Sequence, residues 1–128
     1  MEKFRAFVVE DSPVVLESLA GALEEEAGVR IVGSAPDEGT AMEWLNSRTD
    51  ECDVVIVDIF LKSGSGLGVL KQMRSFAPPP LRVVLTNYAT PDMKVRCREL
   101  GAEIVFDKSN EIDEMLAWFS GRHRHDSR

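Results

Sequence analysis

The sequence contains few cysteines and no long apolar run. Cys52 and Cys97 lie far apart and form no Cys-x-x-Cys pair, which predicts two buried or half-buried free thiols in a reducing compartment. No apolar run approaches the roughly 18 residues that span a membrane. The first residues carry no signal-peptide pattern. Together these absences predict a cytoplasmic location and no contact with a membrane.

Clustered positive charge is also missing. The formal net charge is −7, whereas a surface that binds duplex DNA needs grouped lysine and arginine to displace counterions. The one basic stretch, residues 122–125, lacks apolar periodicity. We therefore expect no direct nucleic-acid binding by this segment. Residues 121–128 are predicted to be a disordered tail or the start of a linker.

The glycine-rich signatures of nucleotide-binding proteins are absent as well. No Gly-x₄-Gly-Lys-[Ser/Thr] occurs, so the sequence has no P-loop. Gly64, Gly66 and Gly68 follow an apolar run but lack the G-x-G-x-x-G spacing of a dinucleotide site. His123 and His125 have no third ligand nearby, which argues against a metal site at that end.

Five apolar runs alternate with five stretches of helical periodicity. The runs predict strands over residues 4–10, 30–35, 53–59, 81–86 and 103–108. Helices are predicted to open at Ser12-Pro13, Pro36-Asp37 and Thr90-Pro91, and to cover residues 67–73 and 112–119. The alternation predicts an α/β fold, a single doubly wound five-stranded parallel sheet with five helices on both faces. The first, third and fourth runs are the most apolar, which favours a strand order of 2-1-3-4-5.

Polar residues follow four of these predicted strands. Glu10-Asp11 ends the first run, Asp58 the third, Thr86 the fourth and Lys108 the fifth. In an open parallel sheet, ligands bind at the edge where the strands have their carboxyl ends. These side chains are therefore predicted to converge around one ligand.

The chemistry of the set favours phosphoryl transfer with a divalent cation. Carboxylates about 4 Å apart repel each other by about 4 kcal/mol at an effective dielectric constant near 20, so the cluster either raises the pKa values of its members or recruits a cation. Mg²⁺ prefers such oxygen ligands and shares a phosphate oxygen. We predict that Glu10 and Asp11 hold Mg²⁺ and that Asp58 accepts the phosphoryl group. Thr86 donates a hydrogen bond to it, and Lys108 adds a positive charge.

In its sequence motifs the chain resembles the receiver domain of bacterial two-component response regulators, which has a chemotaxis-regulator-like, flavodoxin-like fold. The resemblance covers residues 4–120, so we expect a receiver domain over residues 1–120. The matching motifs are Val8-Val9-Glu10-Asp11-Ser12-Pro13, Val55-Ile56-Val57-Asp58, Gly66, Val83-Val84-Leu85-Thr86, Gly101-Ala102 and Asp107-Lys108-Ser109. The order 2-1-3-4-5 is already known for this fold, so the resemblance alone implies it.

The resemblance also implies roles for single residues. It implies that a sensor histidine kinase, or a small phosphodonor, phosphorylates Asp58 in the presence of Mg²⁺. It implies that Thr86 and Lys108 contact the phosphoryl group. The backbone carbonyl of Phe60 is implied as a further metal ligand, beside Glu10, Asp11 and Asp58.

The sequence departs from the family pattern at three positions. Lys62 and Ser109 replace prolines that are common in the family, and Val105 replaces a common aromatic switch residue. Phe106 is the next residue, but strand alternation predicts that it points to the other face of the sheet. These departures bear on the switch mechanism rather than on the phosphorylation chemistry.

Two positions that tune hydrolysis in this family are bulky here. Phe60 lies two residues after the acceptor, and Tyr88 lies two residues after the threonine. We hypothesise that both screen the aspartyl phosphate from water. The alternative for Phe60 is a contact with a partner protein.

Three functions remain open from the sequence. The first is a phosphorylation-dependent switch that is not an enzyme on other substrates. Its output is partner binding, homodimerisation or control of an effector domain through the fourth helix, fifth strand and fifth helix. The second is a pseudo-receiver that binds proteins without being phosphorylated. The third is a small phosphatase, for which we find no separate substrate pocket in the sequence.

Overall fold

The computed structural model describes residues 3–122. The strands are β1 (Arg5–Val9), β2 (Arg30–Ala35), β3 (Val54–Val57), β4 (Leu81–Thr86) and β5 (Ile104–Asp107). The helices are α1 (Pro13–Glu26), α2 (Glu38–Arg48), α3 (Gly66–Met73), α4 (Pro91–Glu99) and α5 (Ile112–Phe119). A short 3₁₀ helix, η1 (Thr49–Glu51), lies between α2 and β3 and was not predicted.

The five strands form one parallel sheet in the order β2-β1-β3-β4-β5. This confirms the predicted strand order. The most apolar runs occupy the centre because both faces of a central strand are covered. All four residues of β3 are buried, whereas most residues of the edge strand β2 are partly exposed.

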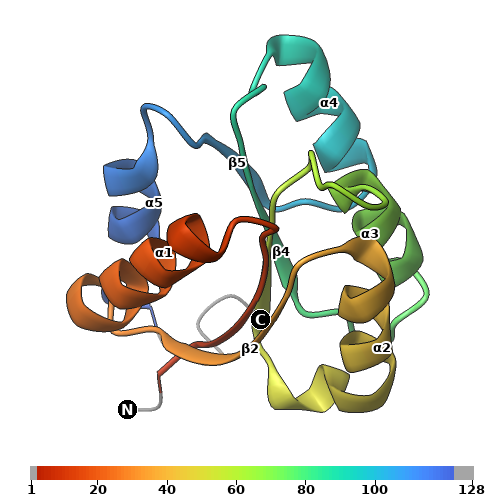
Figure 1. Ribbon diagram of the computed structural model, residues 1–128, viewed down its shortest axis with the longest axis horizontal. Helices are drawn as coiled ribbons and strands as arrows, with labels where there is room; N and C mark the ends of the chain where they lie inside the picture. The colour runs from red at the N-terminus through yellow and green to blue at the C-terminus, as the bar shows by residue number, and fades with distance from the viewer. Residues whose placement is uncertain (1–2, 123–128) are drawn as a thin grey trace.

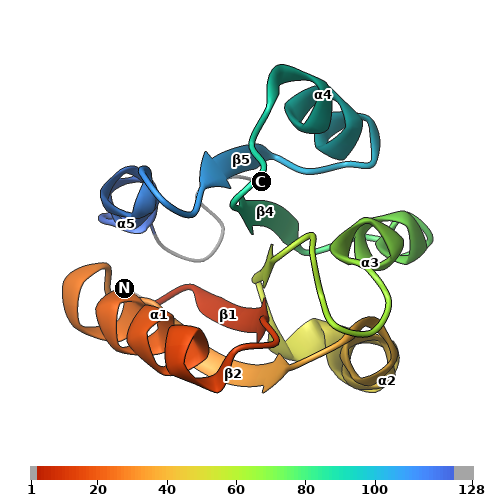
Figure 2. The ribbon, with the colours of Figure 1, turned by 45° about the horizontal axis from the view of Figure 1, so that its top comes forward.

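Helices cover both faces of the sheet, α1 and α5 on one side and α2, α3 and α4 on the other (Figures 1 and 2). Successive side chains of β3 point to opposite faces of the sheet and so belong to two different hydrophobic cores. Val55 and Val57 pack with the α2, α3 and α4 side, while Val54 and Ile56 pack with the α1 and α5 side. The predicted doubly wound arrangement is therefore confirmed.

Local signals in the sequence begin the helices where predicted. Ser12 caps α1 by accepting the Val15 N–H, and Thr90 caps α4 by accepting the Met93 N–H. Asp37 caps α2 in the same way through Thr40, so α2 begins at Glu38 rather than at Pro36.

The start of α3 depends on a glycine. A Cβ on Gly66 would lie 2.1 Å from the carbonyl oxygen of Asp58, closer than any side chain tolerates. The Gly66 N–H also donates to the Ile59 carbonyl at 2.9 Å. Gly66 therefore lets α3 begin directly against the segment that leaves β3.

Both cysteines are free and buried, which confirms the predicted buried thiols. Among residues 3–122, no helix combines the length and apolarity required to cross a bilayer. Of the predicted tail, residues 123–128 lie outside the described residues, and His123 and His125 are among them.

Candidate functional site

The carboxyl ends of the central strands are held in register where the polar residues begin. The Asp58 N–H donates to the Val9 carbonyl at 3.0 Å, which places Asp58 beside the end of β1. The Lys108 N–H donates to the Thr86 carbonyl at 2.9 Å and places Lys108 beside the end of β4. Parallel pairing thus continues past the strands and brings these segments to one edge of the sheet.

The side chains of Glu10, Asp11 and Asp58 form a compact acidic cluster. One carboxylate oxygen from each residue lies within 4.8 Å of the others. Glu10 is 3% exposed and Asp58 is 8% exposed, so the two carboxylates repel each other with little screening by water. The cluster lines a cavity of about 270 Å³ together with six other residues: Ser12, Val15, Phe60, Asn87, Tyr88 and Lys108.

Lys108 partly neutralises this cluster. Its Nζ donates to Glu10 Oε1 at 2.5 Å and to Asp58 Oδ2 at 2.8 Å. Burial by itself lowers the pKa of Lys108, but the hydrogen bonds to Asp58 and Glu10 and their negative charges outweigh it and raise the pKa. With three carboxylates and one ammonium in the formal charged state, the cluster keeps a net charge of −2 and still attracts a cation.

The donor set of the cluster fits a hard divalent cation. Backbone N–H groups fix two of the carboxylates: Ser12 N–H donates to Glu10 Oε2 and Lys62 N–H donates to Asp11 Oδ2, both at 2.9 Å. Asp11 Oδ1 accepts no hydrogen bond from residues 3–122. Carboxylate oxygens of this kind are the ligands that Mg²⁺ prefers, and Mg²⁺ also retains several waters.

The two remaining predicted site residues lie at this edge in different ways. Phe60 lines the cavity, and its N–H donates to Asp58 Oδ1 at 3.3 Å. Thr86 is fully buried at the end of β4, and its Oγ1 accepts the Tyr88 N–H at 3.1 Å. Thr86 is not among the residues that line the cavity.

Asn87 lines the cavity next to Thr86 and was not singled out from the sequence. Its Oδ1 accepts the Ser109 Oγ–H at 3.0 Å, which connects the segment after β4 with the segment after β5. Its position directly after an apolar strand is the same signal that pointed to Asp58.

Two aromatic side chains form the rim of the cavity. The rings of Phe60 and Tyr88 lie 4.6 Å apart between centroids with an interplanar angle of 59°. Phe60 is 51% exposed and Tyr88 is 58% exposed, although each ring has the other as a neighbour. The pair therefore joins the β3 side of the site to the β4 side without closing it to solvent.

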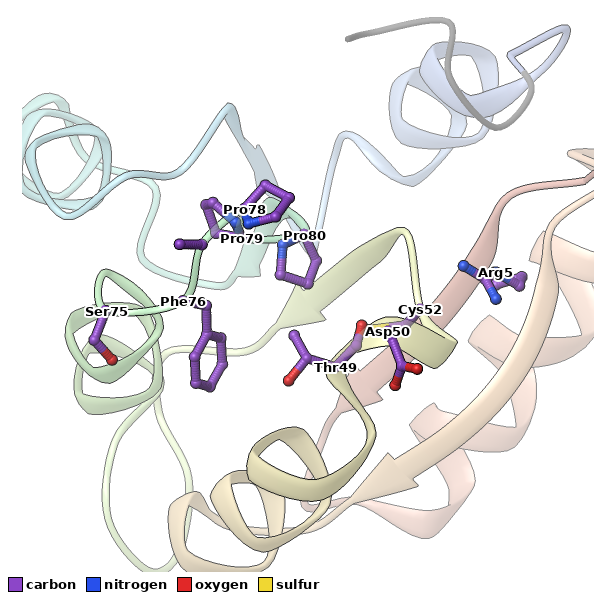
Figure 3. A pocket seen from close by; sticks show the side chains of 10 residues that line it. Arg5, Thr49, Asp50, Cys52, Ser75, Phe76, Pro78, Pro79 and Pro80 are labelled. Carbon is purple, nitrogen blue, oxygen red and sulfur yellow. Dashed lines mark hydrogen bonds between the residues drawn. The ribbon is translucent and has the colours of Figure 1, made fainter.

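A larger cavity lies elsewhere in the described part of the chain. It has a volume of about 560 Å³ and is lined by Arg5, η1 and the Pro78-Pro79-Pro80 turn (Figure 3). The side chain of Arg5 is engaged by Asp53, at 3.0 Å between Arg5 Nη2 and Asp53 Oδ1. This cavity lies at the amino ends of the strands and holds no cluster of carboxylates, so the smaller acidic cavity is the better candidate.

Comparison with known proteins agrees with the fold and the sequence motifs. The sequence model of the response regulator receiver domain matches residues 6–119. The chain therefore belongs to the response regulator receiver domain family. Members of this family are the receiver parts of two-component systems and act in signal transduction, and the membership is consistent with phosphorylation-dependent signalling.

The curated relatives are longer than this chain. A protein-glutamate methylesterase/protein-glutamine glutaminase of Anaeromyxobacter dehalogenans is 33% identical over 106 residues, which are 81% of this chain and 28% of that protein. The transcriptional regulatory protein DltR of Streptococcus agalactiae is 32% identical over 123 residues, which are 96% of this chain and 53% of that protein. The chain thus spans about half or less of these relatives.

Solved structures show the same architecture. The signal receiver domain of the response regulator NarL from Mycobacterium tuberculosis superimposes with a TM-score of 0.78 at 25% identity, covering 95% of this chain and all of that domain. A response regulator of the LuxR family from Aurantimonas superimposes with a TM-score of 0.82 at 24% identity, over 95% of this chain and 89% of that one. The second likeness supports the fold alone.

Proposed function

We propose that this domain is a switch that accepts a phosphoryl group on Asp58 from a sensor histidine kinase in a reaction that requires Mg²⁺. The supporting observation is the cluster of Glu10, Asp11 and Asp58, with Lys108 bonded to two of its carboxylates. Glu10, Asp11, Asp58 and the Phe60 carbonyl would hold Mg²⁺. The ion would supply charge neutralisation for the incoming phosphoryl group.

The residues of the chain then have separate tasks in the transfer. A carboxylate oxygen of Asp58 forms a bond to phosphorus while the bond from phosphorus to the donor nitrogen breaks, leaving an acyl phosphate and a free imidazole. Lys108 Nζ, which lies 2.8 Å from Asp58 Oδ2, pairs with an oxygen of the transferred group. The carboxylates of Glu10 and Asp11 stay charged and keep their backbone donors.

Thr86 would connect the acyl phosphate to the rest of the domain. Its hydroxyl oxygen accepts the Tyr88 N–H, so its proton is available for donation to a phosphoryl oxygen. Movement of Thr86 toward Asp58 would draw the segment between β4 and α4 along with it. We propose that this displacement changes the surface formed by α4, β5 and α5, which would serve partner binding, homodimerisation or an effector domain.

A phosphorylation assay tests the proposal. The protein is incubated with acetyl phosphate, with Mg²⁺ or with EDTA, and separated on a phosphate-affinity gel. We expect a retarded band for the wild type with Mg²⁺, and none with EDTA or in Asp58→Asn. Asp92→Asn, which changes an exposed carboxylate at the start of α4, is the matched control and should keep the band.

The absence of a retarded band in the wild type would contradict the proposal, and so would an equal band in Asp58→Asn. Either result would favour the pseudo-receiver, a protein-binding module with the same fold that does not accept phosphate.

A further inference from the structure

We propose that Glu38, at the start of α2, is a positioning residue for the metal site because it fixes the β3–α3 loop, residues 58–65. This inference rests on the proposed function, since it concerns how the ligands of that site are held. Glu38 lies outside the acidic cluster and would touch neither the metal nor the phosphoryl group.

Both carboxylate oxygens of Glu38 accept hydrogen bonds, one from the end of the β3–α3 loop and one from α3. Oε1 accepts the Ser65 N–H at 2.9 Å, and Oε2 accepts a hydrogen bond from Gln72 Nε2 at 2.8 Å. The Glu38 N–H also faces the Ser63 carbonyl at 3.4 Å. One residue of α2 therefore joins the end of the β3–α3 loop to α3. Bonds to an ionised carboxylate are stronger than neutral ones.

Two glycines, one in the loop and one in α3, leave space for the side chain of Glu38. A Cβ on Gly64 would lie 2.5 Å from Glu38 Cβ, and a Cβ on Gly68 would lie 2.4 Å from either carboxylate oxygen of Glu38. Gly64 also has a φ of +73°, a conformation that glycine adopts without strain. A side chain at Gly64 would be strained and would meet Glu38 Cβ, and one at Gly68 would displace the Glu38 carboxylate, so both glycines favour this contact.

Two further contacts carry the constraint from Ser65 to the acidic cluster. Ser65 pairs with Phe60 across the loop, so the residue whose carbonyl is proposed to hold the metal lies opposite the residue that Glu38 binds. At the tip of the loop, the Lys62 N–H donates to Asp11 Oδ2 at 2.9 Å. Fixing Ser65 thus limits the positions available to both Phe60 and Lys62, and through Lys62 the orientation of Asp11.

The experiment compares Glu38→Ala with two matched variants. In Glu38→Gln the amide oxygen still accepts the Ser65 N–H, and its NH₂ donates to the Gln72 Oε1 once that amide flips. Asp37→Ala removes the cap of α2 through Thr40 without touching the loop, so it controls for general weakening of the helix. Each variant is ¹⁵N-labelled, and amide exchange at Ser65 and Lys62 is measured by NMR without metal.

The second readout is the dissociation constant for MgCl₂, measured by calorimetry, together with the rate of acetyl phosphate transfer at saturating Mg²⁺. In Glu38→Ala we expect faster exchange at both amides and Mg²⁺ binding weakened by about tenfold, as for residues that orient metal ligands. The rate at saturating Mg²⁺ should stay within about twofold of the wild type. Glu38→Gln should restore both amide exchange and Mg²⁺ binding.

Three results would overturn the proposal. The first is an unchanged dissociation constant in Glu38→Ala, the second is an equal loss in Asp37→Ala, and the third is an equal loss in Glu38→Gln. If the wild type itself binds no Mg²⁺, the proposed function fails. The rate of amide exchange at Lys62 then tests the positioning role without Mg²⁺. An unchanged rate in Glu38→Ala would refute that role.

Discussion

Lys108 joins two carboxylates that come from β1 and β3, and its ammonium is the charge that lets them lie so close. Glu10 Oε1 and Asp58 Oδ2 both lie within 2.8 Å of its Nζ. Removal of one partner from a buried ion pair leaves uncompensated charge, which is more costly than the pair itself is favourable. The stability of the domain without metal should therefore depend on this residue.

We expect Lys108→Ala to lower the free energy of unfolding by about 3 kcal/mol in EDTA, because two repelling carboxylates remain in the site. Added Mg²⁺ should raise the stability of this variant more than that of the wild type, since the cation replaces the lost charge. Urea denaturation at pH 7 measures both effects. Lys71→Ala, at an exposed lysine of α3, should change stability by less than about 0.5 kcal/mol. An equal loss in both variants would contradict the argument.

The aromatic rim makes a second prediction at this scale. If Phe60 and Tyr88 screen an aspartyl phosphate from water, Phe60→Asn should shorten its lifetime by about tenfold, equivalent to about 1.4 kcal/mol of barrier. The decay of the retarded band after removal of the phosphodonor measures the lifetime. Val95→Asn replaces another exposed apolar side chain away from the site and should leave the lifetime unchanged. An unchanged lifetime in Phe60→Asn would refute shielding.

At the scale of elements, β5 distributes its side chains between the two cores. Val105 packs in the core beneath α4 with Cys97 and Leu100, whereas Phe106 packs on the α1 and α5 side with Phe119. This confirms the prediction that Phe106 points to the opposite face. Phe106 therefore does not replace the aromatic residue that is common at position 105, and the short Val105 fills its position.

Because Val105 is only 4% exposed, this position has little room for a ring. We expect Val105→Tyr to destabilise the domain by about 1–3 kcal/mol through overpacking. Val95→Tyr, on the exposed side of α4, should be nearly neutral. Thermal or urea unfolding of the two variants provides the comparison. A neutral Val105→Tyr would show that the segment between β5 and α4 moves readily to admit a ring.

At the scale of the whole molecule, buried ionisable groups predict how stability changes with pH. Burial, followed by the charge of Asp53, raises the pKa of the Cys52 thiol from 9.0 to about 12. The pKa of Lys108 is also raised, because its bonds to Asp58 and Glu10 outweigh burial. For a group whose pKa is raised by folding, stability is fully present below the unfolded pKa and is lost as the pH rises toward the folded value.

The free energy of unfolding should therefore stay level up to about pH 9 and then decrease, by about 1–2 kcal/mol at pH 10.5 from Cys52 alone. Urea denaturation between pH 7 and pH 10.5 tests this. Cys52→Ala removes the titrating thiol, so the free energy of unfolding of this variant should decrease less between about pH 9 and pH 10.5. The same slope in both proteins would show that Cys52 does not contribute. Both native thiols should also resist alkylating reagents at pH 8, since each is buried.

The sequence by itself determined the frame of this protein. Short apolar runs and period-3.6 patterns, with Ser12, Asp37 and Thr90 as caps, are local signals, so they located the strands and helices within one or two residues. The apolar content of each run ordered the strands. Because parallel strands end at a common edge, the order also placed Glu10, Asp11, Asp58 and Lys108 near one another.

Only the tertiary structure decided which atoms meet at that edge. Lys108 and Glu10 lie 98 positions apart, and Glu38 and Ser65 lie 27 apart, so no local pattern reports their contacts. The tertiary structure also decided the surroundings of the Thr86 hydroxyl, which is buried and accepts the Tyr88 N–H. Strand order brings residues to a common edge. The individual hydrogen bonds there depend on side-chain rotamers, loop paths and competition among donors, and these three are fixed only when the whole chain is packed.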